Sequence, residues 1–418
     1  MVERMKLMAY TLVSPFLFGL FFRRYGAEKE NAILYHPVFD DLQELVHHYY
    51  LAGHFLPQDA TVIFQVTPAL QEETRRIGSF PPPDYLGDCL TRGGQRFRFE
   101  TEQQGLSLAS LLRKHRPVSV LFWRAPKQSP LMNLALQSSL LHNVDRYSTW
   151  GCYSYPSFRH GLRTRGGLKQ QRAVMQQKFL EYVDGLPNFP RAYLFGTGPS
   201  IEKAFDHDFS DGYRIVCNTM IKNDELMDHI KPHFMVAGDG IYHFGVSKYA
   251  CRFRNDLERF LKRHRCLLVI PEGYYDDFVF HNEALAEFAL PVPYVAQEIN
   301  LRMKEKLEIK FSHNILNQLL LPLASSLCDE VMLLGFDGRK AGDLHFWKSS
   351  DSVNYEDLKV HQHQAHPGFF SGVDHAEYAR IQSDCAEKIM SLGERMGKKY
   401  RCMNPSSNEA LQKRFLTE

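Results

Sequence analysis

Short apolar runs alternate with amphipathic helical stretches along most of this sequence. Between Asn31 and about Asn143 the strand-like runs are NAILYH, TVIFQV and VSVLFWRA, and helical patterns such as FDDLQELVHHYYLAG separate them. From Arg191 onward the strand-like runs are AYLF, RIVCNT, HFMVAGDG, LLVIPE and EVMLLGFDG. Strands separated by helices are typical of parallel sheets with crossover connections. The alternation therefore predicts an α/β protein with two Rossmann-like lobes.

The chain has 418 residues, which is too long for one ordinary hydrophobic core and suits two domains. We predict an apolar N-terminal segment at 1–30, a first α/β lobe at 31–150 and a second α/β lobe at 191–418. The linker at 151–190 contains the basic run FRHGLRTRGGLKQQR. Such a run is either a solvated connection or a contact for an acidic glycan or a lipid headgroup.

Charge and cysteine content exclude several classes of protein. The 50 Lys and Arg nearly balance the 48 Asp and Glu, so no nucleic-acid partner is expected. The eight cysteines are scattered without a CxxC pair, which argues against a zinc site and against a disulfide framework. A reducing cytoplasm is the expected location.

Residues 8–22 (MAYTLVSPFLFGLFF) are apolar and are flanked by Lys6 and by Arg23 and Arg24. The run is shorter than the roughly 20 residues of a typical transmembrane helix, and no small-residue cleavage site follows it. It lies either in the interface of an inner membrane or against a lobe as a buried helix. We therefore expect a cytoplasmic protein and leave peripheral contact with the inner membrane open.

The clearest candidate site is the turn after the strand AYLF. Its residues are Gly196, Thr197, Gly198, Pro199 and Ser200, and a helical pattern follows from about Ile201. Where a strand ends at Gly-x-Gly and a helix follows, the first backbone N–H groups of the helix have no partner within it, and they can bind a phosphate oxygen. The turn is therefore a candidate phosphate site, and a tight strand-to-helix turn without a ligand is the alternative.

Other strand ends and one helix start also carry polar residues. Ligands of open parallel sheets bind beyond the carboxyl ends of the strands, where the loops gather. Asn218 offers an amide for a base or ribose edge, and Asp337 offers a carboxylate for ribose hydroxyls. Ser312 and Asn314 stand before the helical run ILNQLLLPLASSL and form a second candidate anion site. Each of these residues is also compatible with an ordinary Asx turn or helix N-cap.

These motifs resemble those of a known enzyme family. The motifs in this chain are the GTGPS turn, the CNT strand end, the SHN before a helix, the GFDG strand end and a late histidine before a helix that leads to CMNPSS. The bacterial sialyltransferase-type glycosyltransferases, which use CMP-sugars, have similar motifs. The stretch AGDGIYHFG is closer to the related retaining transferases that move β-linked Kdo (3-deoxy-manno-octulosonic acid) from CMP-Kdo. The resemblance covers about 191–407. We therefore expect a GT-B-like organisation with the N-terminal lobe on the acceptor side.

The resemblance implies a CMP site in the C-terminal lobe. The Gly196–Ser200 turn, Ser312 and Asn314 would hold the phosphate, and Asn218 would face the nucleotide or the sugar. The residues expected at the ribose and the cytosine are Gly335, Asp337 and Gly338. The leaving group carries one phosphate, so no divalent metal is needed, and the sequence has no convincing Asp-x-Asp pair. We expect no cofactor and no metal, only the CMP-sugar donor.

Two mechanisms require two different side chains near the anomeric carbon. A retaining reaction needs a carboxylate nucleophile, and the candidate is Asp239, between two glycines that leave room for a substrate. An inverting reaction needs a base on the acceptor hydroxyl, and the histidine candidates are His375, His366 and then His243. Inverting members of the family have tyrosines shortly after the GFD strand, whereas Phe346 and Trp347 stand in that region here. This difference favours the retaining mechanism.

We interpret the sequence as a glycosyltransferase that moves Kdo or a related acidic sugar from its CMP donor to a bacterial surface polysaccharide or a lipid-linked glycan. An inverting CMP-sialic acid transferase with a histidine base is the nearest alternative. A pterin diphosphokinase-like enzyme, which would need ATP and Mg²⁺, shares the glycine-turn arrangement. A binding protein that keeps the sheet without turnover is the third alternative.

Overall fold

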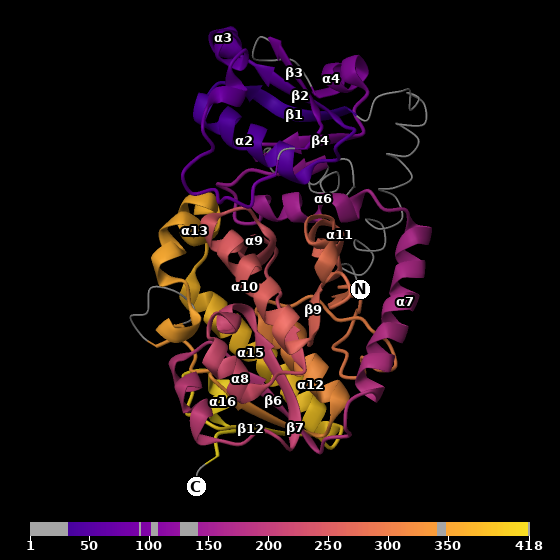
Figure 1. Cartoon of the computed structure of the whole chain (residues 1–418), viewed down its shortest axis with the longest axis vertical. Helices are drawn as coiled ribbons and strands as arrows, with labels where there is room; N and C mark the ends of the chain where they lie inside the picture. Colours follow the sequence, from indigo (N-terminus) through magenta and orange to yellow (C-terminus); the bar gives the residue numbers. More distant parts are fainter. Residues whose placement is uncertain (1–31, 92, 102–107, 126–140, 341–347, 417–418) are drawn as a thin grey trace. The chain divides into compact units, whose positions relative to one another are not determined.

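The computed structural model describes residues 32–91, 93–101, 108–125, 141–340 and 348–416. They form two compact units, each with its own sheet (Figure 1). The first unit runs to Leu162 and regains Val246–Lys248 and Val360–Gly372, while the second holds the rest of the described chain. The prediction of two Rossmann-like α/β lobes is confirmed.

The first sheet is parallel and has the strand order β3-β2-β1-β4-β5. Its side chains alternate between two cores, so that Ile33 and Tyr35 face one core and Leu34 faces the other. Every residue of β2 is buried, as expected where both faces of a sheet are covered. The strands are β1 (Ala32–Phe39), β2 (Thr61–Val66), β3 (Arg96–Thr101), β4 (Ser119–Phe122) and β5 (Leu141–Asn143). The helical elements are α2 (Leu42–Phe55), η1 (Pro68–Leu70), α3 (Gln71–Thr74), η2 (Ile77–Ser79), α4 (Leu108–His115), η3 (Gly151–Tyr153), α6 (Ser154–Gly161), α13 (Lys359–Ala365) and α14 (Pro367–Gly372).

The second sheet is also parallel and has seven strands in the order β10-β9-β8-β7-β6-β11-β12. The chain proceeds outward from β6 to β10 and then returns to the other side of β6 with β11. The strand order therefore reverses between β6 and β11, which makes this the switch point where such sheets bind ligands. The strands are β6 (Arg191–Phe195), β7 (Gly212–Cys217), β8 (Phe234–Val236), β9 (Leu267–Pro271), β10 (Ala289–Val292), β11 (Glu330–Leu334) and β12 (Lys399–Cys402).

Helices and turns connect these strands (Figure 1). Before β11 the chain is first π-helical and then α-helical, and Pro322 stands at the junction. Proline has no N–H to continue the i→i−4 ladder, which fits an irregular turn at this place. The elements are α7 (Arg165–Asp184), η4 (Pro199–Asp206), η5 (Asn218–Lys222), α8 (Asp224–Ile230), α9 (Gly240–Phe244), α10 (Lys248–His264), α11 (Glu272–His281), η6 (Glu283–Leu285), η7 (Leu316–Leu320), α12 (Leu321–Leu327), η8 (Asp351–Val353), η9 (Glu356–Leu358), α15 (His375–Arg395) and α16 (Glu409–Gln412).

Residues 151–190, predicted as a basic linker, are largely helical and contain η3, α6 and α7. Two of their arginines pair with α11 inside the second unit. Arg163 bonds Asp276 with a shortest N–O distance of 2.5 Å, and Arg172 bonds Glu272 at 2.6 Å. Both arginines therefore join this segment to acidic partners on α11 while their side chains stay partly exposed to solvent.

Some predictions fall on residues outside the described part, namely 8–22, Phe346 and Trp347. Among the helices that the structure describes, none combines the length and the apolar character needed to cross a bilayer. The scattered cysteines argued against a disulfide framework, and Cys89 and Cys251 are the cysteines for which the structure corrects this, because each is disulfide-bonded. The free thiols among the described cysteines are Cys217, Cys266, Cys328, Cys385 and Cys402.

Candidate functional site

The glycine turn after β6 and the loop after β11 meet at the switch point of the second sheet. The Gly198 N–H donates to the carbonyl oxygen of Gly335 at 2.8 Å. A Cβ atom on Gly196 would lie 2.4 Å from the same oxygen, and Gly335 has a φ of +84°. Only glycine tolerates both the close approach and this φ. The contact between the two loops therefore explains the glycines at 196 and 335.

Ser200 and Asp337 join the same two loops through their side chains. The Asp337 Oδ2 atom accepts hydrogen bonds from the Ser200 N–H at 3.2 Å and from the Ser200 hydroxyl at 2.9 Å. A Cβ atom on Gly198 would lie 2.1 Å from this Oδ2. The expectation of free N–H groups in the turn is therefore wrong for Gly198 and Ser200, because protein oxygens accept both. Contact of Asp337 with a ribose remains a prediction.

The other predicted residues of these loops are also held by the protein. The Thr197 carbonyl oxygen accepts from the Ser350 N–H at 2.7 Å, and Pro199 begins η4. Gly338 has a φ of +76°, and a Cβ atom there would lie 2.6 Å from the Asn408 nitrogen. The turn is thus a packed junction of three segments, as its ligand-free alternative predicts, and its role in phosphate binding remains a prediction.

Asn218 lies at the end of the neighbouring strand β7 and begins η5. Its φ is +51°, in the left-handed region that only a few residue types enter readily. Its Oδ1 atom is buried and accepts no hydrogen bond from the described residues. An unsatisfied buried acceptor and a left-handed backbone are both destabilising, and both occur preferentially at functional sites. Asn218 is therefore a strong candidate for contact with a ligand hydroxyl or amine.

Asp239 follows β8 and is the N-cap of α9. Its half-buried carboxylate accepts through Oδ1 from the N–H groups of Ile241 and Tyr242, both at 3.0 Å. The Asp239 N–H in turn donates to Nδ1 of His243 at 3.3 Å. Burial lowers the pKa of His243 to about 3, so this imidazole is neutral and acts as an acceptor. These bonds fix the orientation of the Asp239 carboxylate, and they also give the residue a structural role as a cap.

The space above the two glycines that flank Asp239 is filled by protein. A Cβ atom on Gly240 would lie 2.3 Å from Cζ of Tyr274, and one on Gly238 would lie 2.6 Å from Cδ1 of Ile315. The expectation that these glycines leave room for a substrate is therefore wrong, because they leave room for Tyr274 and Ile315. The Tyr274 ring is brought next to Asp239 in this way.

Three half-buried tyrosines lie within electrostatic reach of the Asp239 carboxylate. They are Tyr274 on α11, Tyr294 after β10 and Tyr378 on α15. Burial raises the pKa of each phenol, and the Asp239 charge raises it further, for Tyr378 to about 12. Tyr294 also donates to Oε1 of Gln318, in the π-turn η7, at 3.2 Å. Protonated phenols near a carboxylate provide hydrogen-bond donors to a ligand bound there.

Sequence reasoning missed these tyrosines because they come from three elements that are far apart in the chain. The one local signal was Gly240, whose missing side chain accommodates Tyr274. Tyrosines at the carboxyl edge of the sheet are thus present, although not in the segment after the GFD strand where the resemblance places them.

Ser312 and Asn314 precede η7, at the start of the helical run predicted from the sequence. Asn314 accepts through Oδ1 from the Leu316 N–H at 2.8 Å and donates through Nδ2 to Oε1 of Gln382 at 2.8 Å. Both polar groups of its side chain are therefore used within the protein. The Ser312 hydroxyl lies beside the Cys385 thiol on α15 and acts against the burial that raises the pKa of that thiol. Phosphate binding by this pair remains a prediction.

His375 is the first residue of α15, behind the N-cap Asp374. Its imidazole is half-buried, and its pKa is lowered from the usual value by burial and by the Arg339 charge, against an opposing effect of Asp374. The ring is therefore largely neutral at pH 7 and able to accept a proton. Tyr378 follows three residues later on the same helix, so both side chains occupy one face of its first turn.

His366 belongs to the first unit, whereas Asp239 and His375 belong to the second. It is buried, and its pKa is lowered to about 3 by burial and by the Arg146 charge. Arg146 bonds Glu44 at 2.7 Å and donates to Tyr85 at 2.6 Å, so His366 lies near a buried ion pair. An imidazole with so low a pKa is a weak base, which favours a structural role for His366.

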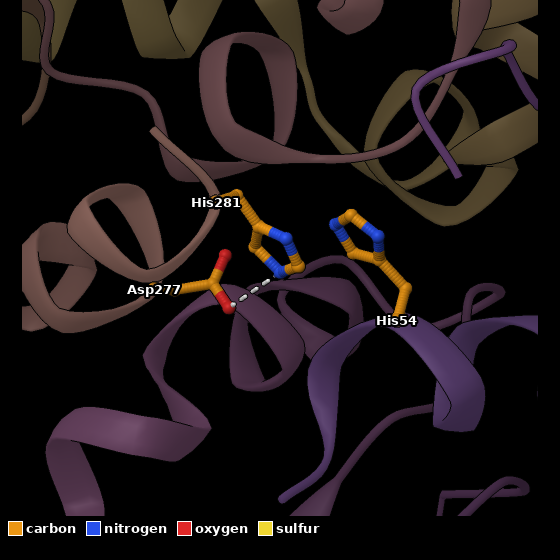
Figure 2. Close-up of side chains that lie close together, drawn as sticks. All are labelled: His54, Asp277 and His281. Atoms are coloured by element: carbon orange, nitrogen blue, oxygen red, sulfur yellow. Dashed lines mark ion pairs between the residues drawn. The ribbon is translucent and has the colours of Figure 1, made fainter. Parts of the chain in front are cut away.

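The helix that carries Tyr274 also holds a buried carboxylate–imidazole pair. Oδ1 of Asp277 lies 3.6 Å from Nε2 of His281, one turn later on α11 (Figure 2). This contact lies within the helix, whereas the pairs that Arg163 and Arg172 make with Asp276 and Glu272 connect α11 to the segment that contains α7. The helix therefore presents Tyr274 to Asp239 from a rigid support.

Comparisons with known proteins add only distant likenesses. No protein-family model and no curated protein matches the chain. Among solved structures, the sialyltransferase CstII from Campylobacter jejuni with a bound substrate analogue is 11% identical, covers 51% of this chain and 80% of its own, and has a TM-score of 0.29. The monofunctional α-2,3-sialyltransferase Cst-I from Campylobacter jejuni is 10% identical, covers 56% and 90%, and has a TM-score of 0.32. At these scores the likenesses carry no argument about this chain.

Proposed function

We propose that this chain is a glycosyltransferase that moves an acidic 3-deoxy-2-ulosonic sugar, Kdo or a related one, from its CMP donor to a glycan. The observation that carries the proposal is the position of Asp239. This carboxylate follows β8, two strands from the switch point, and three tyrosines from separate elements lie near it. A carboxylate held in place near phenolic donors suits substitution at an anomeric carbon.

The donor nucleotide is assigned to the switch point between β6 and β11. Ligands of open parallel sheets bind there, beyond the carboxyl ends of the strands. The unsatisfied Oδ1 of Asn218, at the end of β7, supports this assignment because it is an acceptor for a donor group of the nucleotide or its sugar. A CMP leaving group carries one phosphate, so we propose a reaction without a metal cofactor.

In the proposed reaction Asp239 attacks the anomeric carbon of the bound sugar. The new carboxylate–carbon bond forms as the carbon–phosphate oxygen bond breaks, and CMP leaves with the electron pair. A hydroxyl of the acceptor then attacks the same carbon and gives its proton to a phosphate oxygen of the departing CMP, and the bond from the carbon to the carboxylate breaks to release Asp239. Two inversions give net retention. The amides of Ile241 and Tyr242 hold the carboxylate in one orientation throughout.

The second candidate is an inverting transferase with His375 as the base. Its lowered pKa keeps the imidazole unprotonated at neutral pH, as a base requires. In this alternative the acceptor hydroxyl attacks directly, and the carboxylate of Asp239 serves only as a helix cap. The acceptor in either case is proposed to be a bacterial surface polysaccharide or a lipid-linked glycan at the cytoplasmic face of the inner membrane.

The stereochemistry of the product tests this proposal. Purified protein is incubated with CMP-Kdo or CMP-sialic acid and a panel of bacterial surface oligosaccharides, and NMR of the product reports the anomeric configuration. Retention with CMP-Kdo supports the proposal, and inversion supports the His375 alternative. Calorimetry that detects ATP–Mg²⁺ but no CMP would instead favour a diphosphokinase-like enzyme. CMP binding without any transfer would indicate a protein that has kept the site without turnover.

A further inference from the structure

Four aromatic rings form a row in the second unit. The ring centroids of Tyr294 and Phe311 are 5.8 Å apart, those of Phe311 and His313 are 5.5 Å apart, and those of His313 and Tyr378 are 5.3 Å apart. We call these four residues the aromatic row. Both tyrosines at its ends lie near the Asp239 carboxylate, as described above, so the row borders the candidate reaction centre.

Phe311 is the exposed member of the row, with 55% of its surface accessible. A single exposed phenylalanine is common on proteins, but the chain beside this one is held in place. The Ile309 N–H donates to the Pro293 carbonyl oxygen at 3.0 Å, and the Ala296 N–H donates to the Ile309 carbonyl oxygen at 3.1 Å. The strand-like stretch before Phe311 is thus paired with the stretch around Tyr294. A ring on such a support binds a ligand with little loss of conformational entropy.

The order of the strands places one end of this row, Tyr294, on the far side of Asp239 from the proposed nucleotide site, while the other end, Tyr378, stands on α15. Along the sheet, β8 is two strands from β6 at the switch point, and β10, which leads to Tyr294, is two strands further in the same direction. Neighbouring strands are about 4.8 Å apart, so each of these steps spans about 10 Å. A donor that reaches from the switch point to Asp239 therefore leaves the region beyond β8 to the other substrate.

We infer that Phe311 is the stacking platform for one pyranose ring of the acceptor glycan. The C–H face of a pyranose is apolar and fits the electron-rich face of a phenyl ring, while the sugar hydroxyls find hydrogen-bond partners in the tyrosines of the aromatic row. This inference rests on the proposed function. It also places one sugar of the acceptor in the second unit, whereas the sequence assigned the acceptor side to 31–150.

A binding experiment tests the platform without any need for turnover. Saturation-transfer-difference NMR is recorded with methyl β-D-galactopyranoside on the wild-type protein and on Phe311→Ala, Phe311→Trp and Phe205→Ala. Phe205 is the matched control, because it is an exposed phenylalanine of the same unit that lies outside the row. The signal is expected to fall several-fold in Phe311→Ala only and to persist in Phe311→Trp. An equal signal in Phe311→Ala and Phe205→Ala, or no signal with the wild type, would overturn the inference.

Steady-state kinetics then assign the platform to one of the two substrates. With an acceptor found in the oligosaccharide panel, Phe311→Ala is expected to raise the acceptor KM about five- to tenfold, the size of a lost ring contact, with the donor KM unchanged. A rise in the donor KM alone would identify a donor subsite and refute the inference. If no variant transfers any sugar, the proposed function fails, and the NMR experiment still decides whether Phe311 binds a pyranose.

Discussion

Replacement of Asp239 separates its chemical role from its structural one. Its Oδ1 accepts from two backbone amides at 3.0 Å, which an asparagine oxygen also does. Asp239→Asn therefore keeps the cap of α9 and is expected to change the free energy of unfolding by less than about 0.5 kcal/mol. Asp239→Ala loses both bonds and is expected to cost about 1 kcal/mol, or about 3 °C in melting temperature for a unit of this size.

The effect on turnover is expected to be far larger than the effect on stability. The asparagine amide is too weak a nucleophile to replace the carboxylate. Asp239→Asn is therefore expected to lower kcat by about 10⁴-fold or more with CMP-Kdo as donor. Asp41→Asn is the matched control, because Asp41 caps α2 in the first unit with the same geometry, at 2.8 and 3.1 Å. Calorimetric melting and a product assay are run on all three variants.

The reasoning about Asp239 is refuted if Asp239→Asn keeps more than about a tenth of the wild-type kcat, a loss of no more than about 1.4 kcal/mol in transition-state stabilisation. In that case the carboxylate is only a cap, and the inverting alternative with His375 gains support. A large loss in Asp41→Asn would also remove the argument, because it would show that capping alone controls activity.

Two further variants test the surroundings of the site, and a third tests an ion pair elsewhere in the second unit. Gly240→Ala is expected to destabilise the protein by about 1–3 kcal/mol, since its new methyl group overlaps the Tyr274 ring, and an unchanged melting temperature would contradict this packing. Asn218 has a left-handed backbone and a side-chain oxygen without a hydrogen-bond partner among the described residues. Asn218→Gly removes the strain and the oxygen, so it is expected to raise the melting temperature and to weaken CMP binding measured by calorimetry. Tighter or unchanged CMP binding would exclude Asn218 from the ligand site. Glu387 bonds Arg414, which lowers the pKa of Glu387 from 4.5 to about 2, so this contact stabilises the fold above about pH 4.5 and is lost as the pH falls through about 2. The difference in melting temperature between the wild type and Glu387→Gln is therefore expected to shrink toward pH 2, and a constant difference would argue against the ion pair.

Much of the fold followed from local pattern. The apolar runs AYLF and EVMLL became β6 and β11, because short β-branched and aromatic runs between helical stretches have few other stable arrangements. The glycine turn after β6 was also placed correctly at a strand end. Its amides were not free, however, because Asp337 lies 137 residues later in the chain and no local rule shows that it accepts from Ser200.

The sequence by itself determined that this chain forms two parallel α/β sheets and that polar residues such as Asn218 and Asp239 follow their strands. Only the tertiary structure decided which side chains gather there. Tyr274, Tyr294 and Tyr378 come together near Asp239 because three separate elements pack on the carboxyl edge of one sheet. The same folding sends the segment with His366 into the first unit and leaves His375 in the second. Residues close together in the sequence determine where strands and turns form. The residues that meet in a site are determined by long-range packing, because every element must bury its apolar surface in the same fold.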